Sequence, residues 1–384
     1  MQLIIFSMKR FIITLLALIL LLPRASAAQE LVDTGTAKAV LLTPLMSDIA
    51  VVEENEDALL PVSGLAKLPA ILALALAFDE GIIQPDAAIQ VSKKASSIGG
   101  PTAFLDAGEV VGAEELLKAA VMISAGDAIW ALGESAFGSE QVFLQNIHVV
   151  TQRLGLTLEL NDCLGIGTPM SAKDLLRLGQ AAAGSPSFVK YATHYMDELR
   201  HKDGRVTELV NANRMIRGYA GCFGLLTGSA REEGYSGVFA VTKNEMSYVA
   251  VVIGATGSED RFTAAMRLFD YAFANCKQRT LATAYEPLLA DYPVLYGDCA
   301  TVNLVAHETV VCLLQKQDGE LGCEYELPEK LLPPLYPSTS VGRAIFSYPG
   351  AAPLYVIDLY PEIEVVSFGF VDILMRFFHG FMVG

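Results

Sequence analysis

The stretch Gly237-Val-Phe-Ala-Val-Thr-Lys-Asn-Glu-Met-Ser-Tyr-Val-Ala-Val-Val-Ile-Gly254 predicts a β-hairpin. Two runs rich in β-branched and aromatic residues, 237–242 and 247–254, flank the polar link 243–246. Such a pattern is typical of two antiparallel strands joined by a short turn. We therefore expect a sheet built around residues 237–254.

Toward the N-terminus, the sequence predicts two more strands and then a helical block. The strands are expected around a turn, at 38–43 and 48–53. The helical segments are expected at 65–79, at 114–137 with a break near 124–126, and at 139–154, 171–184 and 186–198. An amphipathic helix at 261–276 follows the hairpin. Strands at both ends with helices between them predict an α/β sheet with a helical insertion.

The last third of the chain has a different pattern. Residues 281–365 carry short alternating apolar runs separated by proline breaks such as Pro333-Pro334 and Pro337, which predicts a small β-rich domain. Residues 366–384 predict an amphipathic C-terminal helix, because five apolar side chains fall on one helical stripe: Phe370, Leu374, Phe377, Phe378 and Phe381. Such a helix either lies on a membrane surface or packs on its own domain.

The first 27 residues have the pattern of an export signal. Lys9 and Arg10 precede the apolar run 11–22, and the small-residue triplet 25–27 follows it. A basic lead, a short apolar core and an A-x-A site are typical of a secretory signal peptide. A transmembrane helix needs about 20 apolar residues, so an uncleaved anchor is the less favoured alternative. We expect cleavage after Ala27 and an extracytoplasmic protein.

Composition excludes several classes of protein. Of the 384 residues, 52% are hydrophobic and 18% charged, which is not the composition of a disordered chain. The 27 Lys and Arg against 43 Asp and Glu give a formal charge of −16. Removing Lys9, Arg10 and Arg24 with the signal leaves 24 against 43, or −19. This charge repels a phosphate backbone, so nucleic acid is not an expected partner.

Cysteine and histidine patterns point to no metal or cofactor. The six cysteines contain no C-x-x-C pair, and the five histidines form neither H-E-x-x-H nor H-x₃-H. We expect Cys163 and Cys222 to behave as small buried hydrophobes. Cys299, Cys312 and Cys323 lie close together in the β-rich segment, where one disulfide bridge is conceivable.

Three short segments combine hydroxyl, amine and glycine positions in a regular order. They are Pro61-Val-Ser63-Gly64-Leu-Ala-Lys67, Met122-Ile-Ser124-Ala-Gly126-Asp127-Ala128 and Gly224-Leu-Leu226-Thr227-Gly228. Their order and spacing resemble S-x-x-K, S-x-N and K-T-G, the active-site motifs of penicillin-binding enzymes. Segments 116–134 and 211–214 further resemble the low-molecular-mass D-alanyl-D-alanine carboxypeptidases, serine peptidases of the bacterial cell wall.

The resemblance covers essentially the whole chain. It implies a penicillin-binding-type α/β domain at 30–277, a β-rich domain at 281–365 and an amphipathic helix at 366–384, after a signal peptide at 1–27. It also implies a role in peptidoglycan metabolism.

The first two motifs depart from the family pattern at positions that the resemblance assigns to the reaction. A Ser three residues before Lys67 would attack an acyl carbon after the amine had activated its hydroxyl, but Gly64 stands there. The second motif keeps Ser124, yet Gly126 replaces the Asn whose amide would hold the substrate backbone.

The third motif departs in the same way. Thr227 and Gly228 are present, but Leu226 stands at the Lys position. A cation that would complement the terminal carboxylate of a substrate is therefore missing. Gly126, Leu226, Thr227 and Gly228 form the expected substrate-binding set.

Ser63 and Lys67 require separate interpretations. Ser63 is four residues before Lys67 and precedes a helical run, so we expect it to cap the helix; the alternative is a substitute nucleophile. Lys67 either pairs with a neighbour such as Ser124, keeps an anion contact for a ligand, has its pKa lowered by burial, or extends to water; we favour the last.

Three functional hypotheses follow. The first is an exported carboxypeptidase-family protein with an impaired active site that binds wall peptide or partner proteins. The second is a working serine-type D-alanyl-D-alanine carboxypeptidase or acyl hydrolase that uses Ser63 or Ser124. The third is a non-enzymatic assembly protein at the membrane surface that works through the β-rich segment.

Overall fold

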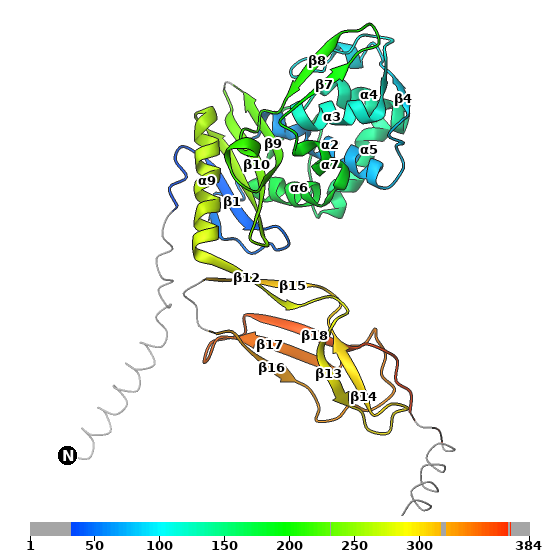
Figure 1. The fold of residues 1–384 in the computed structure, drawn as a ribbon, viewed down its shortest axis with the longest axis vertical. Helices are drawn as coiled ribbons and strands as arrows, with labels where there is room; N and C mark the ends of the chain where they lie inside the picture. The colour runs from blue at the N-terminus through cyan, green and yellow to red at the C-terminus, as the bar shows by residue number, and fades with distance from the viewer. Residues whose placement is uncertain (1–31, 231, 316–319, 368, 370–384) are drawn as a thin grey trace, which may run out of the picture. The chain divides into compact units, whose positions relative to one another are not determined.

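The computed structural model describes residues 32–230, 232–315, 320–367 and 369 (Figure 1). The predicted signal peptide at 1–27 lies outside these residues, as does most of the predicted helix at 366–384. Ser367 forms an isolated antiparallel bridge with Gly297, so the predicted helix does not begin at 366. Within the described ranges, every helix is too short or too polar to cross a membrane.

The predicted hairpin is the centre of a five-stranded antiparallel sheet. Its strands follow the order β2-β1-β11-β10-β9. Their bounds are Ala39–Pro44 for β1, Val52–Glu54 for β2, Cys222–Ala230 for β9, Gly234–Lys243 for β10 and Met246–Ala255 for β11. Strand β1 pairs with β11 along its whole length. Strands from the two ends of residues 39–255 therefore form one sheet.

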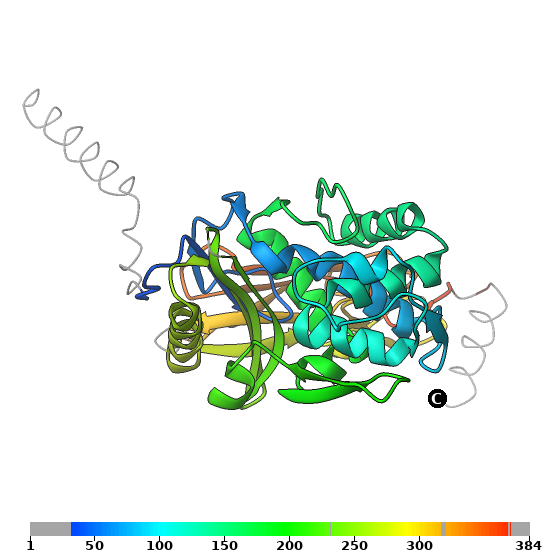
Figure 2. The ribbon, with the colours of Figure 1, turned by 90° about the horizontal axis from the view of Figure 1, so that it is seen from above.

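Helices cover both faces of this sheet (Figure 2). Helix α9 (Ser258–Asn275) packs on β10 and β11 from one side, and α6 (Ala172–Gly184) packs on the same strands from the other. The rest of the helical block consists of η1 (Ser63–Lys67), α2 (Leu68–Asp79), η2 (Ala95–Ser97), α3 (Ala113–Ile123), α4 (Gly126–Phe137), α5 (Glu140–Arg153), α7 (Pro186–Ala192) and α8 (Met215–Gly218). Helix α2 is apolar on nearly every face because it lies inside the block.

Three short strand pairs complete this part of the chain. They are β3 (Leu60–Pro61) with β6 (Pro169–Met170), β4 (Ala88–Gln90) with β5 (Val110–Gly112), and β7 (Met196–Arg200) with β8 (Val206–Val210). The helix predicted at 186–198 is wrong beyond Ala192, where α7 ends. Residues 196–200 find their backbone partners in β8, a pairing that a local pattern does not reveal.

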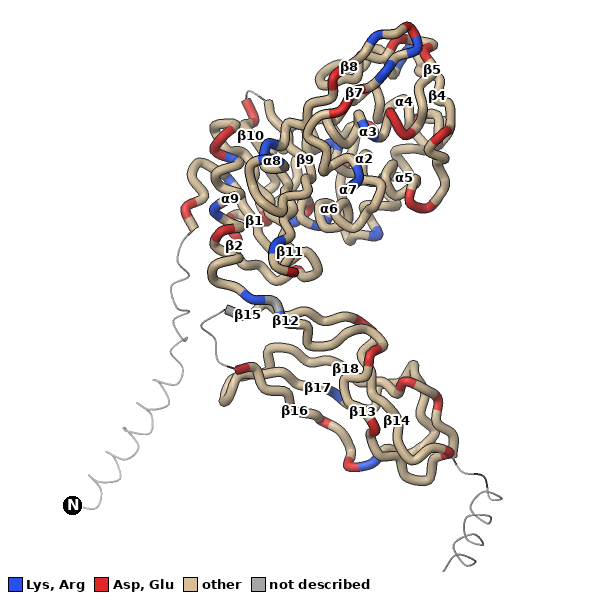
Figure 3. Tube along the Cα trace, viewed as in Figure 1, with Lys and Arg blue, Asp and Glu red and all other residues tan. Residues whose placement is uncertain are grey.

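The β7–β8 hairpin is tied to the loop that precedes α3. Both signs of charge gather there (Figure 3). Arg205 pairs with Asp106 and with Asp203. Inside, His201 Nδ1 lies 2.7 Å from a carboxylate oxygen of Glu109, and both side chains are buried. These contacts hold the loop that leads to the functional site.

The C-terminal strands have a hydrophobic cluster of their own. One sheet has the order β13-β14-β18-β17-β16, and β12 pairs separately with β15. The bounds are Cys276–Ala282 for β12, Pro287–Pro293 for β13, Thr301–Val305 for β14, Val310–Gln315 for β15, Gly322–Glu326 for β16, Gly342–Ser347 for β17 and Tyr355–Pro361 for β18. Leu304, Cys312 and Leu359 lie in the buried cluster. The predicted β-rich character of this part is confirmed.

The six cysteines all lie within the described residues, and none of them forms a disulfide bridge. Cys163, Cys276 and Cys312 are buried, and Cys323 is exposed. Cys222 is partly exposed. The bridge considered among Cys299, Cys312 and Cys323 does not form.

Candidate active-site cleft

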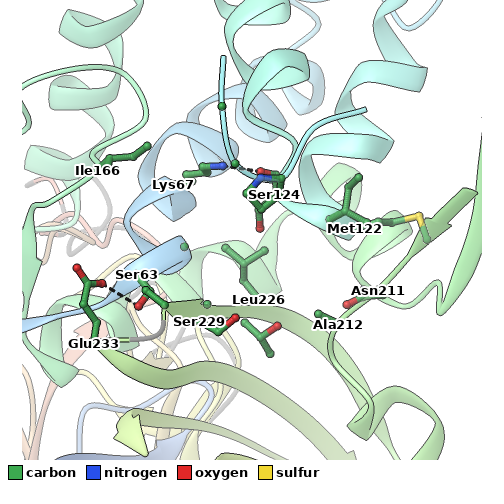
Figure 4. Close-up of a pocket in the computed structure, with 18 of the residues that line it drawn as sticks. Ser63, Lys67, Met122, Ser124, Ile166, Asn211, Ala212, Leu226, Ser229 and Glu233 are labelled. Atoms are coloured by element: carbon green, nitrogen blue, oxygen red, sulfur yellow. Dashed lines mark hydrogen bonds between the residues drawn. The ribbon is translucent and has the colours of Figure 1, made fainter. Parts of the chain in front are cut away.

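A pocket of about 460 Å³ opens where η1, strand β9 and the α3–α4 turn meet (Figure 4). Its lining includes seven of the residues selected from the sequence: Ser63, Gly64, Lys67, Ser124, Leu226, Thr227 and Gly228. Gly126 lies directly behind this lining, since a Cβ there would be 3.4 Å from Lys67 Nζ. The three motif segments, far apart in sequence, therefore meet at one site.

The backbones of η1 and β9 touch at two glycines. A Cβ on Gly228 would fall 2.6 Å from the backbone nitrogen of Leu65, closer than real Cβ contacts allow. A Cβ on Gly64 would instead lie 3.4 Å from the Gly228 Cα, which is close to ordinary contact. Gly228 is thus required by packing, whereas the nucleophile position at Gly64 has room for a side chain and carries none.

Lys67 is buried, with only 3% of its surface exposed. Its Nζ donates to the carbonyl oxygen of Ser124 at 2.8 Å. Burial lowers the pKa of the Lys67 amine, and the nearby Asp127 carboxylate offsets part of that effect. The expectation that Lys67 extends to water is wrong, because the α3–α4 turn closes over its amine and supplies the acceptor.

Asp127 organises the loop that forms one side of the pocket. Its buried carboxylate accepts hydrogen bonds from the backbone nitrogens of Ala103 at 2.9 Å, Leu105 at 3.1 Å and Ala128 at 2.8 Å. The Gly126 nitrogen donates to Pro101 O at 2.9 Å. The motif pattern assigns no role to Asp127. An acidic residue in the first turn of a predicted helix is the feature of the sequence that could have indicated a role in the structure at this position.

The second motif has been filled by an apolar side chain. A Cβ on Gly126 would lie 2.7 Å from the Cγ2 of Ile98, so Ile98 occupies the space into which any side chain at 126 would project. Ser124 adopts a left-handed backbone conformation, with φ of 53°, and ends α3. Within the described ranges its hydroxyl makes no hydrogen bond. Ile98 gave no sequence signal, because it belongs to no polar or glycine pattern.

Leu226 stands in the middle of the cleft. It is only 3% exposed, and Figure 4 shows it below Ser124 and to the right of Ser63. The buried Arg261 bonds the same strand and its neighbour: its Nη1 donates to Gly228 O at 2.9 Å and to Ser236 O at 3.2 Å. Burial lowers the pKa of Arg261 to about 10. The Arg261 guanidinium thus links β9 to β10, and no motif in the sequence indicates this role.

Contrary to the prediction from the sequence, Ser63 does not cap the helix. It lies inside η1 with φ of 51°, and the cap position, Val62, makes no side-chain hydrogen bond. The Ser63 hydroxyl donates instead to Oε2 of Glu233 at 2.8 Å. Glu233 comes from the far side of the β9–β10 turn, so only the tertiary structure brings the two together.

The segment upstream of the third motif forms another part of the lining. Asn211 and Ala212 both line the pocket. The Asn211 amide donates to His194 O at 3.2 Å and accepts from the Asn213 nitrogen at 2.9 Å. Asn211 therefore shapes the backbone here. In residues 32–230, 232–315 and 320–367, no cluster of three or more His, Cys, Asp or Glu is placed to hold a metal ion.

The sheet, its helical insertion and the three segments at one pocket define a penicillin-binding-type transpeptidase fold. The sequence matches the D-alanyl-D-alanine carboxypeptidase family over residues 25–257, and the chain belongs to this family. The family and fold class predicted from the sequence are confirmed.

Named relatives match over most of the chain. The D-alanyl-D-alanine carboxypeptidase DacF of Bacillus subtilis is 26% identical over 96% of this chain and 98% of its own length. DacC of Escherichia coli is 28% identical over 90% of each. The structure of penicillin-binding protein 5 from Haemophilus influenzae superposes with a TM-score of 0.78 at 21% identity, covering 86% of this chain and 98% of that one.

Proposed function

We propose that this protein is an exported, catalytically impaired member of its family that binds peptidoglycan stem peptide or wall-assembly proteins. Family membership makes it a D-alanyl-D-alanine carboxypeptidase-like protein of peptidoglycan metabolism. Export is supported by the signal pattern of residues 1–27. The observation that carries the impairment is Gly64, which leaves no hydroxyl at the nucleophile position of the first motif, three residues before the retained Lys67.

The chemistry of acyl transfer explains why this loss matters. A serine hydroxyl attacks the acyl carbon and gives up its proton to a neighbouring base, and the leaving amine takes a proton as it departs. Lys67, whose pKa is lowered by burial, suits the role of base. At position 64 there is no oxygen to attack, and Ser63 is bonded to Glu233 instead. In another serine hydrolase, loss of the nucleophile costs about 10⁶-fold in kcat.

Apolar side chains occupy the space at two of the positions that depart from the family motifs. Ile98 fills the space beside Gly126, and the isobutyl group of Leu226 lies where the family places a cation. The pocket nevertheless keeps a volume of about 460 Å³, within the range of small-molecule and peptide sites. These features support a cleft that binds without turning over its ligand.

Acylation by a β-lactam tests the impairment. The purified mature chain is incubated with a fluorescent penicillin and examined by intact mass, and D-alanine release from a pentapeptide is measured in parallel. We expect no adduct and no release, with DacF of Bacillus subtilis as the positive control. A stoichiometric acyl adduct on the wild-type chain would overturn the proposal.

A second candidate function is an acyl hydrolase that uses Ser124. It is favoured by one observation: the Ser124 hydroxyl lines the pocket without a hydrogen bond among the described residues, next to the Lys67 amine. An adduct that is lost in Ser124→Ala and kept in Ser63→Ala would establish it; the reverse pattern would assign Ser63. The assembly function considered for the β-rich segment and the membrane contact of 366–384 stay predictions.

A further inference from the structure

We propose that the cleft selects a peptide by a free side-chain amine, which Glu233 binds, rather than by a terminal carboxylate. The proposal rests on the proposed function, namely that wall peptide binds in this cleft. It adds the group of the ligand that is recognised and the residue that recognises it.

No described cation of the cleft is free to bind a carboxylate. Lys67 and Glu233 are the two charged side chains among the described residues that line the pocket. Lys67 is 3% exposed, and its amine already donates to Ser124 O. Arg261, behind β9, is engaged with the carbonyl oxygens of Gly228 and Ser236. A ligand carboxylate would therefore enter without a partner.

Glu233 is the charge that the cleft does offer. Its side chain is partly exposed at the pocket edge, and its Oε2 accepts the Ser63 hydroxyl at 2.8 Å. In the described part of the chain, Oε1 accepts no hydrogen bond, so no described residue occupies this oxygen of the carboxylate. Ser63, whose backbone φ is 51°, supplies the hydrogen bond that holds this carboxylate at the pocket.

The chemistry of this arrangement favours an ammonium group. A primary ammonium offers three N–H donors and a positive charge to a carboxylate, and such charge-assisted bonds are about twice as strong as neutral ones. A ligand carboxylate at the same edge would be repelled. The ligand class is therefore a peptide with a free side-chain amine, as a diamino-acid residue supplies.

Titration calorimetry with matched peptides tests this selection. The probes are L-Ala-γ-D-Glu-L-Lys-D-Ala-D-Ala, the same peptide acetylated on the lysine Nε, and the same peptide amidated at its C-terminus. Acetylation should raise Kd about tenfold, the size of one charge-assisted bond. Amidation should change Kd less than about twofold in the wild type. The Leu226→Lys variant should bind the carboxylate form more tightly than the amide.

Variants of the turn assign the effect to Glu233. Glu233→Gln should bind the free-amine and acetylated peptides equally. Glu232→Gln removes an exposed neighbouring carboxylate that does not line the pocket and should keep the tenfold preference. Loss of the preference in Glu232→Gln would overturn the assignment to Glu233.

The outcomes separate the two proposals. If the wild type binds all three peptides with one Kd, the selection by amine is wrong and peptide binding stands. If no peptide binds to the wild type at millimolar concentration, the peptide-binding function itself fails, and the selection falls with it.

Discussion

Lys67 shows how the role of one side chain changes when its partner is removed. The family pattern pairs this lysine with a hydroxyl three residues earlier, and here the position holds Gly64. The amine remains buried and takes a backbone carbonyl as its acceptor. An amine taken out of water favours its neutral form. Folding is therefore coupled to the protonation of Lys67.

The Lys67→Met variant tests this coupling. The pKa of Lys67 in the folded chain lies below that in the unfolded chain, which is about 10.4. Between these two values the unfolded chain binds more protons, so the free energy of unfolding rises with pH. The stabilisation is complete above the unfolded pKa and is lost as pH falls through the folded pKa.

We expect the free energy of unfolding of the wild type, minus that of Lys67→Met, to rise with pH at up to about 1.4 kcal/mol per unit. Urea denaturation at intervals from pH 7 to pH 10 measures this difference. Taking the difference between two chains removes the contribution of every other titrating group. A difference that stays constant over this range would show that folding does not lower the pKa of Lys67.

Strand β9 and the single turn η1 form the contact on which the cleft is built. The third motif lies on β9 and the first on η1, and their backbones meet at Gly228 and Gly64. The two glycines face one another but differ in what surrounds them. A Cβ at Gly228 meets backbone atoms on η1, which cannot move aside as a flexible side chain can.

Alanine substitutions at the two glycines should therefore have unequal effects. Gly228→Ala should lower the free energy of unfolding by about 3 kcal/mol, the upper range for overpacking a well-packed site. Gly64→Ala, whose Cβ would make a 3.4 Å contact, should change it by less than about 1 kcal/mol. Urea denaturation followed by the fluorescence of Trp130 compares them. Equal losses would mean that the close approach of β9 to η1 is not the constraint.

Two hydrophobic clusters of the described chain differ in size. The larger includes α2, most of the helical block and the side of the first sheet that α6 covers, and the smaller joins the C-terminal strands. Each contains a buried cysteine, Cys163 in the first and Cys312 in the second. Burial raises the pKa of the Cys163 thiol to about 12 and that of Cys312 above its ordinary value. Both thiols should react only when their own cluster opens.

Pulse labelling with N-ethylmaleimide along a urea gradient tests the proposed division into domains. Cys323, which is exposed, should react without urea. Cys312 should react at lower urea than Cys163, because its cluster buries less apolar surface. Mass spectrometry of the digested chain reads each site separately. Labelling of Cys163 and Cys312 at one urea concentration would indicate a single cooperative unit instead.

The sequence alone determined the family, the central hairpin and most of the helices. Residues 237–254 predict β10 and β11 because strand composition and turn composition are local properties. The sequence also predicts a break near 124–126, and the structure shows that the left-handed Ser124 ends α3 there. Gly64, Gly126 and Leu226 could be located by counting from Lys67, Ser124 and Thr227, since motif spacing is preserved along the chain.

Only the tertiary structure decided what those positions do. The partner of Ser63 is 170 residues away in Glu233, and the acceptor for Lys67 is 57 residues away in Ser124. Ile98 beside Gly126 and Arg261 behind Gly228 belong to no motif. Hydrogen bonds and steric contacts depend on distance in space, whereas a sequence pattern reports only separation along the chain. For that reason the missing groups were evident from the sequence, and the side chains that replaced their contacts were evident only in the fold.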